Sequence, residues 1–424
     1  MVFRLRTAGR GCAAALALLA VVPAFCYDNG LGRTPPMGWN SWCTGTLLEP
    51  SVCNLVGNDP CSEGEVKAIA DSLVANGMDK LGYEFLELDD CWSDTARDAS
   101  GQLQADARKF PSGMASLADY VHARGLKLGL YTSVGDKTCK GDRPGSYGHY
   151  ATDASTLAGW GVDMIKMDHC GAKGNGTFTD RQLYGEMSAA LNATGRPVLF
   201  SLCSWGEQSV LEWGADVAQM YRIQMDHLPF FNLPTTASGV GYGQGTLQII
   251  NYVADIVPSR WTRTFGWLDP DFLMTRYGTM DFVASRTEYS FWSLWSAPLL
   301  VATDLRKLSA DKRAILLNEE VIAINQDGSA TSGDRIRPPP NVTGVDSQLW
   351  ARPLANGDKA VILFNAGKRK GLGVAVAWAE LGWAPADSVR VRDLWAKKDL
   401  GVFTAGFNAT LDSHDVAMLR LTRQ

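Results

Sequence analysis

Two acidic residues, Asp168 and Asp226, are the strongest candidates for catalytic chemistry in this sequence. Asp168 stands near the end of the run WGVDMIKMDHC (160–170), which otherwise has the apolar character of a buried strand. Because side chains alternate along a strand, Met164, Lys166 and Asp168 should share one face. The Lys166 ammonium would favour the ionised form of the Asp168 carboxyl, as a nucleophile requires. Asp226 is the candidate for a second carboxyl, kept protonated by a less polar setting and able to act as a general acid.

Polar and aromatic residues also stand at or just after the ends of other apolar runs. They are Asp89 and Asp90, Tyr131, Cys203, Arg222, and Asp269 with Asp271. Any one of them has an ordinary structural explanation, because an aspartate at a strand end often caps the next helix and aromatic residues usually pack in the core. Their repetition at the same end of successive runs instead indicates a shared rim.

The chemistry that this rim would support is that of a sugar site. Two carboxyl groups in different roles, polar walls and a flat tryptophan such as Trp42 suit sugars, which offer many hydroxyls and one apolar face. Glycoside hydrolysis is therefore the leading hypothesis. A barrel enzyme that binds Mg²⁺ through carboxylates is an alternative, but Lys166 and Arg222 would compete with the cation. A non-catalytic sugar-binding protein is the third interpretation. We expect no metal and no cofactor.

The elements that would position these residues are short apolar runs that alternate with helical patterns, which is typical of βα units. The strand candidates are 37–42, 83–90, 126–132, 162–168, 197–203, 218–223, 265–271 and 297–304. This number of units closes a (β/α)8 TIM barrel of the α/β class, whose strands end at the face that holds active sites. One helix between them should begin at Ser62, with Glu65 completing a capping box, and stop at Gly77.

Changes in character along the chain divide it into three segments. Residues 1–26 set arginines before an apolar run too short to span a bilayer, which is the layout of a secretory signal peptide. Residues 27–328 would form the catalytic barrel. After the Pro-rich break SGDRIRPPPN, alternating runs such as KAVILFN predict a small C-terminal antiparallel β-sandwich over 329–424.

Composition limits the partners and the compartment. The 424 residues carry a formal net charge of −5, which gives no reason to expect nucleic acid or an anionic membrane. The expected partner is a neutral small molecule or polymer, and a homo-oligomer is compatible with the sequence. The signal implies secretion or a secretory-pathway compartment, such as a lysosome, vacuole or cell wall. Candidate glycosylation sites in sequons fit that compartment, at Asn175, Asn192, Asn341 and Asn408.

Seven cysteines lie beyond the signal segment, which allows three disulfides and one free thiol in an oxidising compartment. They are Cys43, Cys53, Cys61, Cys91, Cys139, Cys170 and Cys203. Three pairings are open for the first four, because their spacing does not select one of them.

The residues singled out above lie in stretches that closely resemble the α-galactosidase (melibiase) family, glycoside hydrolase family 27. The matching stretches are NGLGRTPPMGWNSW, LELDDCW, FPSGMASLADYVHARGLKLGLYTSVGDKTC, RPGSYGHYATDASTLAGWGVDMIKMDHC, DPD, FWSLWSAPLLVATDL and EVIAINQD. They run from about residue 28 to 327, and beyond them only the general β-sandwich pattern is shared. The resemblance implies a retaining enzyme that releases terminal α-D-galactosyl residues from oligosaccharides, galactomannan or glycolipids.

The resemblance also implies residue roles. Asp168 would attack the anomeric carbon to form a covalent glycosyl enzyme, while Asp226 would protonate the leaving oxygen and later deprotonate water. Retention requires the two carboxyls to lie about 5 to 5.5 Å apart. The implied sugar contacts are Asp89 and Asp90 to O4 and O6, Lys166 to O3 and O4, and Arg222 to O2, with Trp42 packed on the ring and Tyr131 and Asp271 completing the pocket.

Cysteines and specificity residues complete what the resemblance implies. A Cys139–Cys170 disulfide would brace the third and fourth strand ends and leave Cys203 free in the pocket. Cys203 and Trp205 in SLCSWGEQ resemble plant and fungal α-galactosidases. Trp205 leaves little room for an acetamido group, so α-N-acetylgalactosaminidase activity is the weaker alternative and β-L-arabinopyranosidase activity the closer one.

Two positions depart from the family pattern. Phe272 stands where methionine is common, and Leu268 stands where asparagine is usual. These departures predict a reshaped rim at the seventh strand.

Overall fold

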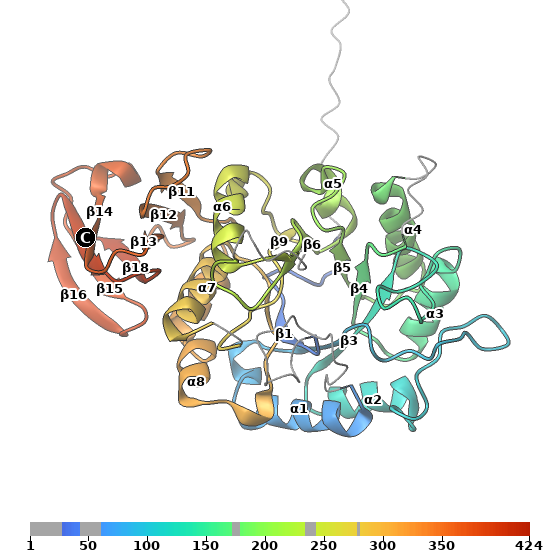
Figure 1. The fold of residues 1–424 in the computed structure, drawn as a ribbon. Coiled ribbons are helices and arrows are strands. Elements are labelled where there is room, and N and C mark those ends of the chain that lie inside the picture. Colours follow the sequence, from blue (N-terminus) through green and yellow to red (C-terminus); the bar gives the residue numbers. More distant parts are fainter. Residues whose placement is uncertain (1–27, 43–60, 172–178, 234–242, 278–279) are drawn as a thin grey trace, which may run out of the picture.

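The computed structural model describes residues 28–42, 61–171, 179–233, 243–277 and 280–424, and the first part of the fold is a barrel (Figure 1). Within these residues eight parallel strands form one sheet in the order β10-β1-β2-β3-β4-β5-β6-β9. The ring closes at Leu273, which donates its N–H to the Leu300 carbonyl and accepts from the Ala302 N–H, at 2.9 and 3.1 Å. The strands are β1 (Met37–Asn40), β2 (Phe85–Leu88), β3 (Lys127–Ser133), β4 (Met164–Asp168), β5 (Leu199–Cys203), β6 (Met220–Arg222), β9 (Trp267–Asp269) and β10 (Leu299–Val301).

Helices surround the barrel sheet (Figure 1). They are α1 (Glu63–Ala75), α2 (Gly113–His122), α3 (Tyr150–Gly159), α4 (Asp180–Ala193), α5 (Val210–Val217), α6 (Thr246–Ile256), α7 (Phe282–Leu294), α8 (Ala310–Leu316) and α9 (Glu319–Asn325). Short 3-10 helices add η1 (Asp79–Leu81), η2 (Pro258–Arg260) and η3 (Leu305–Lys307).

Helix α1 begins where the sequence predicts it. The Ser62 hydroxyl accepts the Glu65 N–H, and this satisfies one of the free donors of the first turn. The Glu65 carboxylate accepts from the Cys61 N–H and the Ser62 hydroxyl, instead of from the Ser62 N–H that a capping box would use. Gly77 follows the end of the helix with φ +74°, a conformation that favours glycine.

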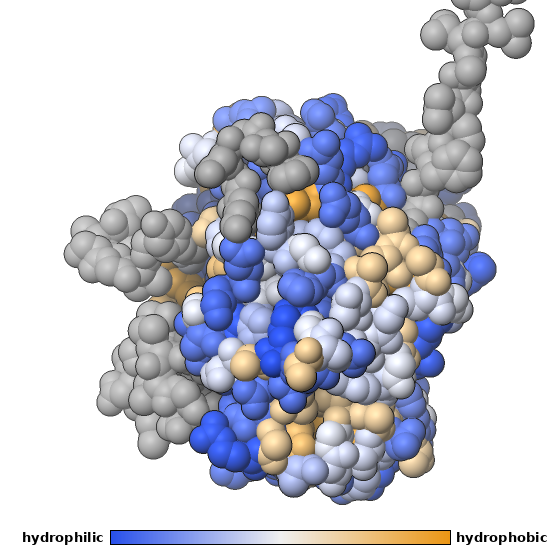
Figure 2. Space-filling model, turned by 90° about the vertical axis from the view of Figure 1, so that its right-hand side faces the viewer, coloured by the Kyte–Doolittle hydropathy of each residue, from blue (hydrophilic) through white to orange (hydrophobic). Residues whose placement is uncertain are grey.

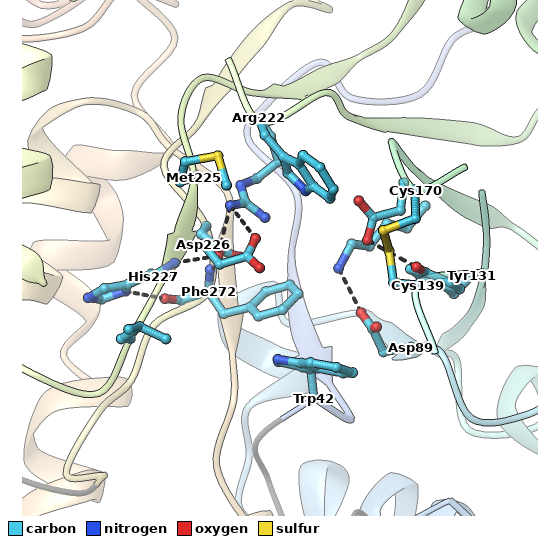
Figure 3. Close-up of a pocket in the computed structure, with 15 residues that line it drawn as sticks. Trp42, Asp89, Tyr131, Cys139, Cys170, Arg222, Met225, Asp226, His227 and Phe272 are labelled. Carbon is cyan, nitrogen blue, oxygen red and sulfur yellow. Dashed lines mark hydrogen bonds and ion pairs between the residues drawn. A yellow bond between two sulfur atoms is a disulfide. The ribbon is translucent and has the colours of Figure 1, made fainter. Parts of the chain in front are cut away.

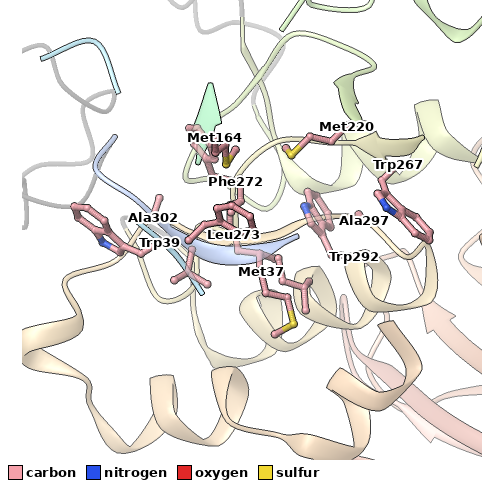
Figure 4. Packing of buried hydrophobic residues seen from close by; sticks show 14 of the residues in the cluster. Met37, Trp39, Met164, Met220, Trp267, Phe272, Leu273, Trp292, Ala297 and Ala302 are labelled. Carbon is pink, nitrogen blue, oxygen red and sulfur yellow. The ribbon is translucent and has the colours of Figure 1, made fainter. Parts of the chain in front are cut away.

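Strand β4 lies between two neighbours that cover both of its edges. Lys166 is the register partner of Tyr131 on β3 and of Ser201 on β5. Every residue of β4 is buried, because helices cover the outer face of the sheet and the barrel interior covers the other. Met164 of β4 and Met220 of β6 belong to the packed hydrophobic core shown in Figure 4.

The C-terminal part is a β-sandwich beside the barrel (Figure 1). Within the described residues, a sheet in the order β11-β12-β13-β18-β15-β16 faces the pair β14-β17. The strands are β11 (Asp334–Arg337), β12 (Ser347–Pro353), β13 (Lys359–Asn365), β14 (Leu372–Ala377), β15 (Val389–Asp393), β16 (Lys398–Phe403), β17 (Gly406–Leu411) and β18 (Val416–Arg423), with η4 at Trp378–Leu381.

Alternation along the sandwich strands produces two apolar faces. Leu349 and Leu363 belong to the core of the sandwich, whereas their neighbours Trp350, Ile362 and Phe364 belong to the barrel's core cluster. The rings of Trp350 and Phe364 contact Phe291 of α7 edge-on, with centroid separations of 5.1 Å each. The larger sheet therefore joins the sandwich to the barrel through a continuous apolar layer.

The predicted fold class, a (β/α)8 barrel followed by a β-sandwich, is confirmed, and each predicted barrel strand overlaps an observed one, with β3 extending one residue beyond its predicted end. The short parallel pair β7 (Asp226–His227) and β8 (Gly243–Gln244) was not predicted. The predicted boundary after residue 328 falls between α9 and β11. The signal segment 1–26 lies outside the described residues. Among the helices that are described, none has the length and apolar character needed to cross a membrane.

Candidate active site

A pocket of about 310 Å³ opens at the carboxyl ends of the barrel strands (Figure 3). Its volume falls in the range of small-molecule sites. Nine of the predicted site residues line it: Trp42, Asp89, Tyr131, Lys166, Asp168, Trp205, Arg222, Asp226 and Asp271. These residues come from loops and strands scattered between positions 42 and 271, and the barrel brings them together because its strands all end at one face.

Asp168 stands at the end of β4 with two hydrogen-bond donors. The Tyr131 hydroxyl donates to Oδ2 at 3.0 Å, and the His169 N–H donates to Oδ1 at 2.8 Å. Burial raises the pKa of the Asp168 carboxyl above its usual value, although the nearby Lys166 ammonium lowers it in part. Lys166 therefore favours the ionised form of Asp168, as the sequence predicts, but desolvation is the larger effect at this buried position.

Lys166 forms its ion pair with Asp89, not with Asp168. The Nζ atom lies 2.7 Å from Asp89 Oδ2, and both side chains are almost fully buried. Asn40 of β1 also donates to that oxygen, at 3.3 Å. The Phe272 ring lies 4.6 Å from the ammonium and stabilises it by a cation–π contact. Phe272, one of the two departures from the family pattern, is thus a wall of the pocket.

Asp226 of the β7 segment lines the same pocket as Asp168 and lies beside Arg222 and Met225 (Figure 3). Its side chain is 52% exposed, and Oδ1 lies 3.0 Å from Arg222 Nη2. Although much of the side chain is exposed, the surrounding pocket walls partly desolvate the carboxyl and raise its pKa, and the Arg222 guanidinium opposes that shift in part. Asp271 Oδ2 also lies 3.0 Å from Arg222 Nη2, so one guanidinium orients two acids. The two candidate catalytic carboxyls share one hollow, as the glycosidase hypothesis requires.

Two predicted site residues, Asp90 and Cys203, are absent from the pocket lining within the described residues. Asp90 Oδ2 accepts the Lys140 N–H at 2.9 Å, and burial raises the pKa of its carboxyl to about 6. Cys203 is a buried free cysteine whose Sγ accepts from Arg222 Nη1 at 3.5 Å. Burial also raises the pKa of this thiol. Both residues are thus buried outside the pocket lining. Asp90 contacts the backbone of Lys140, and Cys203 contacts Arg222, which does line the pocket.

Two pocket residues adopt left-handed backbone conformations. Trp205 has φ 55° and Asp271 has φ 83°, values that cost non-glycine residues energy and often mark functional sites. The edge of Trp205 packs against the His169 ring, with centroids 5.1 Å apart. Leu268, the other departure from the family pattern, is buried in the core cluster and is not in the lining. Of the two departures, only Phe272 is in a position to reshape the pocket, and the reshaping itself stays a prediction.

The described residues contain two disulfides, and one of them lines the pocket. Cys139 and Cys170 are joined, as the resemblance implies, and both line the pocket beside Asp168. Cys61 is joined to Cys91, while Cys43 and Cys53 lie outside the described residues. The sulfurs of Cys139 and Cys170 lie with Asp168 in a group of metal-ligand atoms, but sulfurs in a disulfide are not free thiolates. Among the described residues no other such group occurs.

Sequence reasoning missed several residues of the site. Met225, His227 and Leu228 line the pocket beside Asp226. His227 donates from Nδ1 to the Phe272 carbonyl at 2.9 Å, and burial lowers its pKa to about 4, so the ring is neutral. The sequence signal that could have identified His227 as a site residue is its position directly after Asp226, the predicted acid. Asn40, which accepts the Trp42 N–H at 2.6 Å, could have been found as a polar residue inside an apolar strand.

The candidate glycosylation sites lie at the surface where they are described. Asn192, Asn341 and Asn408 are exposed, and Asn175 lies outside the described residues. Figure 2 shows one face of the molecule as mainly hydrophilic, with hydrophobic colour in small separate patches.

Comparison with known proteins places this geometry in a family. A family model described as alpha galactosidase A matches residues 34–327, and one described as the alpha galactosidase C-terminal beta sandwich domain matches residues 344–421. An alpha-galactosidase of Cyamopsis tetragonoloba is 36% identical over 401 residues, which are 95% of this chain and 89% of that protein.

Solved structures agree with the sequence matches. Alpha-galactosidase I from Mortierella vinacea superposes with a TM-score of 0.84 and 34% identity, covering 93% of this chain and 98% of that one. An alpha-galactosidase from Saccharomyces cerevisiae, solved with raffinose, superposes with a TM-score of 0.83 and 28% identity, covering 94% of this chain and 99% of that one.

Proposed function

The chain belongs to the α-galactosidase family and is a glycoside hydrolase, and from this premise we propose that it is a retaining α-galactosidase that releases terminal α-D-galactosyl residues. The observation that carries the proposal is the pair of carboxyls, Asp168 and Asp226, on the wall of one pocket. A retaining mechanism needs two carboxyls on opposite sides of the anomeric carbon.

In the first step, an Asp168 oxygen forms a bond to the anomeric carbon of galactose. The bond between that carbon and the glycosidic oxygen breaks, and Asp226 transfers its proton to this oxygen so that the aglycone leaves as a neutral alcohol. In the second step Asp226 removes a proton from water as the water oxygen attacks the same carbon. The Asp168–carbon bond then breaks, and galactose is released with its configuration retained.

The surroundings of the two carboxyls favour these roles. Asp168 accepts hydrogen bonds from the Tyr131 hydroxyl and the His169 N–H, which stabilise an anion in a buried place. Burial raises the pKa of Asp226, which favours a protonated form able to act as an acid. Its partly exposed side chain also leaves water a path to the carboxyl during the second step.

The remaining wall offers hydrogen-bonding groups for the sugar hydroxyls and apolar surface for the ring. By the family resemblance, the Asp89–Lys166 pair would bind O3, O4 and O6, and Arg222 would bind O2. Trp42 provides the flat apolar surface. Asp90 would contribute through a rearrangement or a water, since it lies behind the lining.

Specificity within the family rests on the residues near the 2-position. Trp205 occupies the wall beside His169 and leaves limited space for an acetamido group. We therefore favour galactose over N-acetylgalactosamine. β-L-Arabinopyranosidase activity is the second candidate, because that sugar differs from galactose mainly at C6.

We also propose that the protein functions in the secretory pathway or outside the cell. The Cys61–Cys91 and Cys139–Cys170 disulfides require an oxidising compartment. The exposed sequon asparagines Asn192, Asn341 and Asn408 are accessible to glycosylation.

A panel of nitrophenyl glycosides tests the proposed function. The α-galactoside should be hydrolysed fastest, ahead of the β-L-arabinopyranoside, with little turnover of the α-N-acetylgalactosaminide. Addition of EDTA should leave these rates unchanged. Loss of activity with EDTA would favour a metal-dependent enzyme, and no turnover of any substrate would favour a sugar-binding protein.

A further inference from the structure

Glu87 is a buried acid in the barrel interior, and neither the pocket lining nor the reaction above gives it a role. It is 0% exposed, and neither carboxyl oxygen has a hydrogen-bond partner among the described residues. Glu87 stands two residues before Asp89 on β2, so both side chains point to the same side of the sheet. Its carboxyl therefore lies one layer below the Asp89–Lys166 pair that faces the pocket.

The neighbouring strand leaves room for this side chain. Gly129 of β3 is the register partner of Glu87. A Cβ at position 129 would come within 3.2 Å of the Cα, Cβ and Cγ atoms of Glu87, which is closer than ordinary van der Waals contact. The absence of a side chain at Gly129 therefore leaves the space that the Glu87 side chain occupies, and the barrel accommodates this buried acid without a steric clash.

The groups that act on Glu87 come from three sides. Lys166 from β4 and the Asn40 amide from β1 favour its charged form, whereas Asp89 from β2 and Asp269 from β9 favour its neutral form. Gly129 on β3 contributes no charge. Burial is the largest effect and raises the pKa of Glu87 to about 8. A carboxylate would be costly in this buried place, because the loss of hydration outweighs the help from Lys166 and Asn40, so the protonated form is the stable one at neutral pH.

We propose that Glu87 is a positioning residue, which lies beneath the sugar site and leaves Lys166 paired with Asp89, facing the sugar hydroxyls. This inference rests on the proposed function of the pocket. While Glu87 is neutral, the Lys166 ammonium has its close partner in Asp89 Oδ2 at 2.7 Å. Once Glu87 is ionised, it becomes a second anion on the inner side of Lys166 and draws the ammonium away from the pocket. Sugar binding should then weaken at alkaline pH.

The test is the galactose dissociation constant, measured by calorimetry as a function of pH. The variants are Glu87→Gln and Glu87→Met, which cannot ionise. Glu288→Gln is the matched control, because Glu288 of α7 is equally buried and burial raises its pKa to about 8 as well. Its partners are the Met274 N–H and His227, whose Nδ1 lies 3.6 Å from Oε1, and not Lys166. Between about pH 6 and pH 9 the wild-type Kd should rise about tenfold, and that of both Glu87 variants less than about twofold. The control should follow the wild type.

Thermal unfolding gives a second measure that does not depend on sugar. The folded protein holds the Glu87 proton at pH values where the unfolded chain has lost it, so wild-type stability should fall as pH rises from about 5 to about 8. The Tm advantage of Glu87→Gln should grow across that range, and a constant Tm difference would overturn the inference.

The outcomes separate the two proposals. If wild type binds galactose and Glu87→Gln shows the same pH dependence of Kd, the inference is wrong and the proposed function is unaffected. If wild type does not bind galactose at any pH, the proposed function fails, and the role of Glu87 in sugar binding fails with it.

Discussion

At the scale of single residues, Asp168 and Asp226 differ in their hydrogen-bond donors, although burial raises the pKa of both. Asp168 accepts from a phenol and a backbone N–H, and burial raises the pKa of Tyr131 so that its hydroxyl keeps its proton. Asp226 forms an ion pair with the Arg222 guanidinium, and about half of its side-chain surface is exposed. A closed, hydrogen-bonded carboxylate suits a nucleophile, and an open carboxyl that exchanges protons with water suits an acid and base.

Removal of the acid should affect substrates according to their leaving group. We expect Asp226→Ala to lower kcat by about 10² to 10⁴ for an alkyl galactoside, because the leaving alkoxide then departs without a proton. A dinitrophenyl galactoside needs no such proton, so its first step should stay fast. Azide should restore its turnover, because azide attacks the glycosyl enzyme without a general base. Steady-state rates with both substrates check this, and equal losses for the two would contradict the assignment.

The pH dependence of kcat should be bell-shaped and shifted upward. The rate falls at low pH when Asp168 becomes protonated, and it falls at high pH when Asp226 loses its proton. Since burial raises both pKa values, each limb should lie above the pH expected for an exposed aspartate. A pH–rate profile of wild type and Asp226→Ala measures this. The alkaline limb of kcat should be missing in the variant, and an unchanged limb would assign it to another group.

At the scale of elements, the ends of β3 and β4 and their loops are tied by the Cys139–Cys170 disulfide, which also lines the pocket. The bond spans 31 residues of chain, close to the 30 of Cys61–Cys91, so the two should restrict the unfolded chain to a similar extent. Their effects on activity should differ, because Cys61 and Cys91 do not line the pocket within the described residues.

Replacement of each cysteine pair by alanine tests this difference. Either double variant should lose about 2 to 4 kcal/mol of unfolding free energy, measured by urea denaturation. The Cys139/Cys170 variant should also lose kcat well below its unfolding temperature, because the segment beside Asp168 is no longer held. Full activity in that variant would show that the disulfide contributes only stability.

Patterns local to a strand could be predicted from the sequence, and contacts across the barrel could not. Apolar runs ending in Asp89, Lys166 or Asp168 carry their own signal, because alternation and strand ends are encoded within a few residues. The partner of Lys166 depends on which strand lies opposite, and the balance between burial and charge at Asp168 depends on the whole surrounding wall. Glu87 had a local signal, as an acid inside FLEL, but its meaning depends on Gly129 of the next strand.

At the scale of the whole molecule, the sandwich is joined to the barrel by a buried arginine. Arg352 of β12 is 0% exposed and donates to the Ile324 carbonyl at 2.7 Å and to the Asp327 carbonyl at 3.3 Å. These carbonyls belong to the end of α9 and the turn after it, so the arginine caps the last helix of the barrel. Apolar contacts of Trp350 and Phe364 with α7 surround this cap.

Loss of that arginine should destabilise both parts together. We expect Arg352→Met to cost about 3 kcal/mol, because it leaves buried carbonyls without donors. Arg420→Met on β18 of the same sheet is the control, since the Arg420–Asp358 pair is partly exposed and should contribute less than about 1 kcal/mol. Calorimetry should show one unfolding transition at a lower temperature for Arg352→Met. Two separate transitions in wild type would mean that the sandwich and barrel unfold independently.

The most direct test of the central claim is to trap the covalent intermediate. A fluorinated α-galactosyl substrate with a good leaving group should form the glycosyl enzyme faster than water can release it. After proteolysis, mass spectrometry should find one galactosyl adduct, on Asp168 in the peptide containing KMDHC. An adduct on a different residue, or steady turnover of the natural glycoside with inversion and no adduct, would contradict the account.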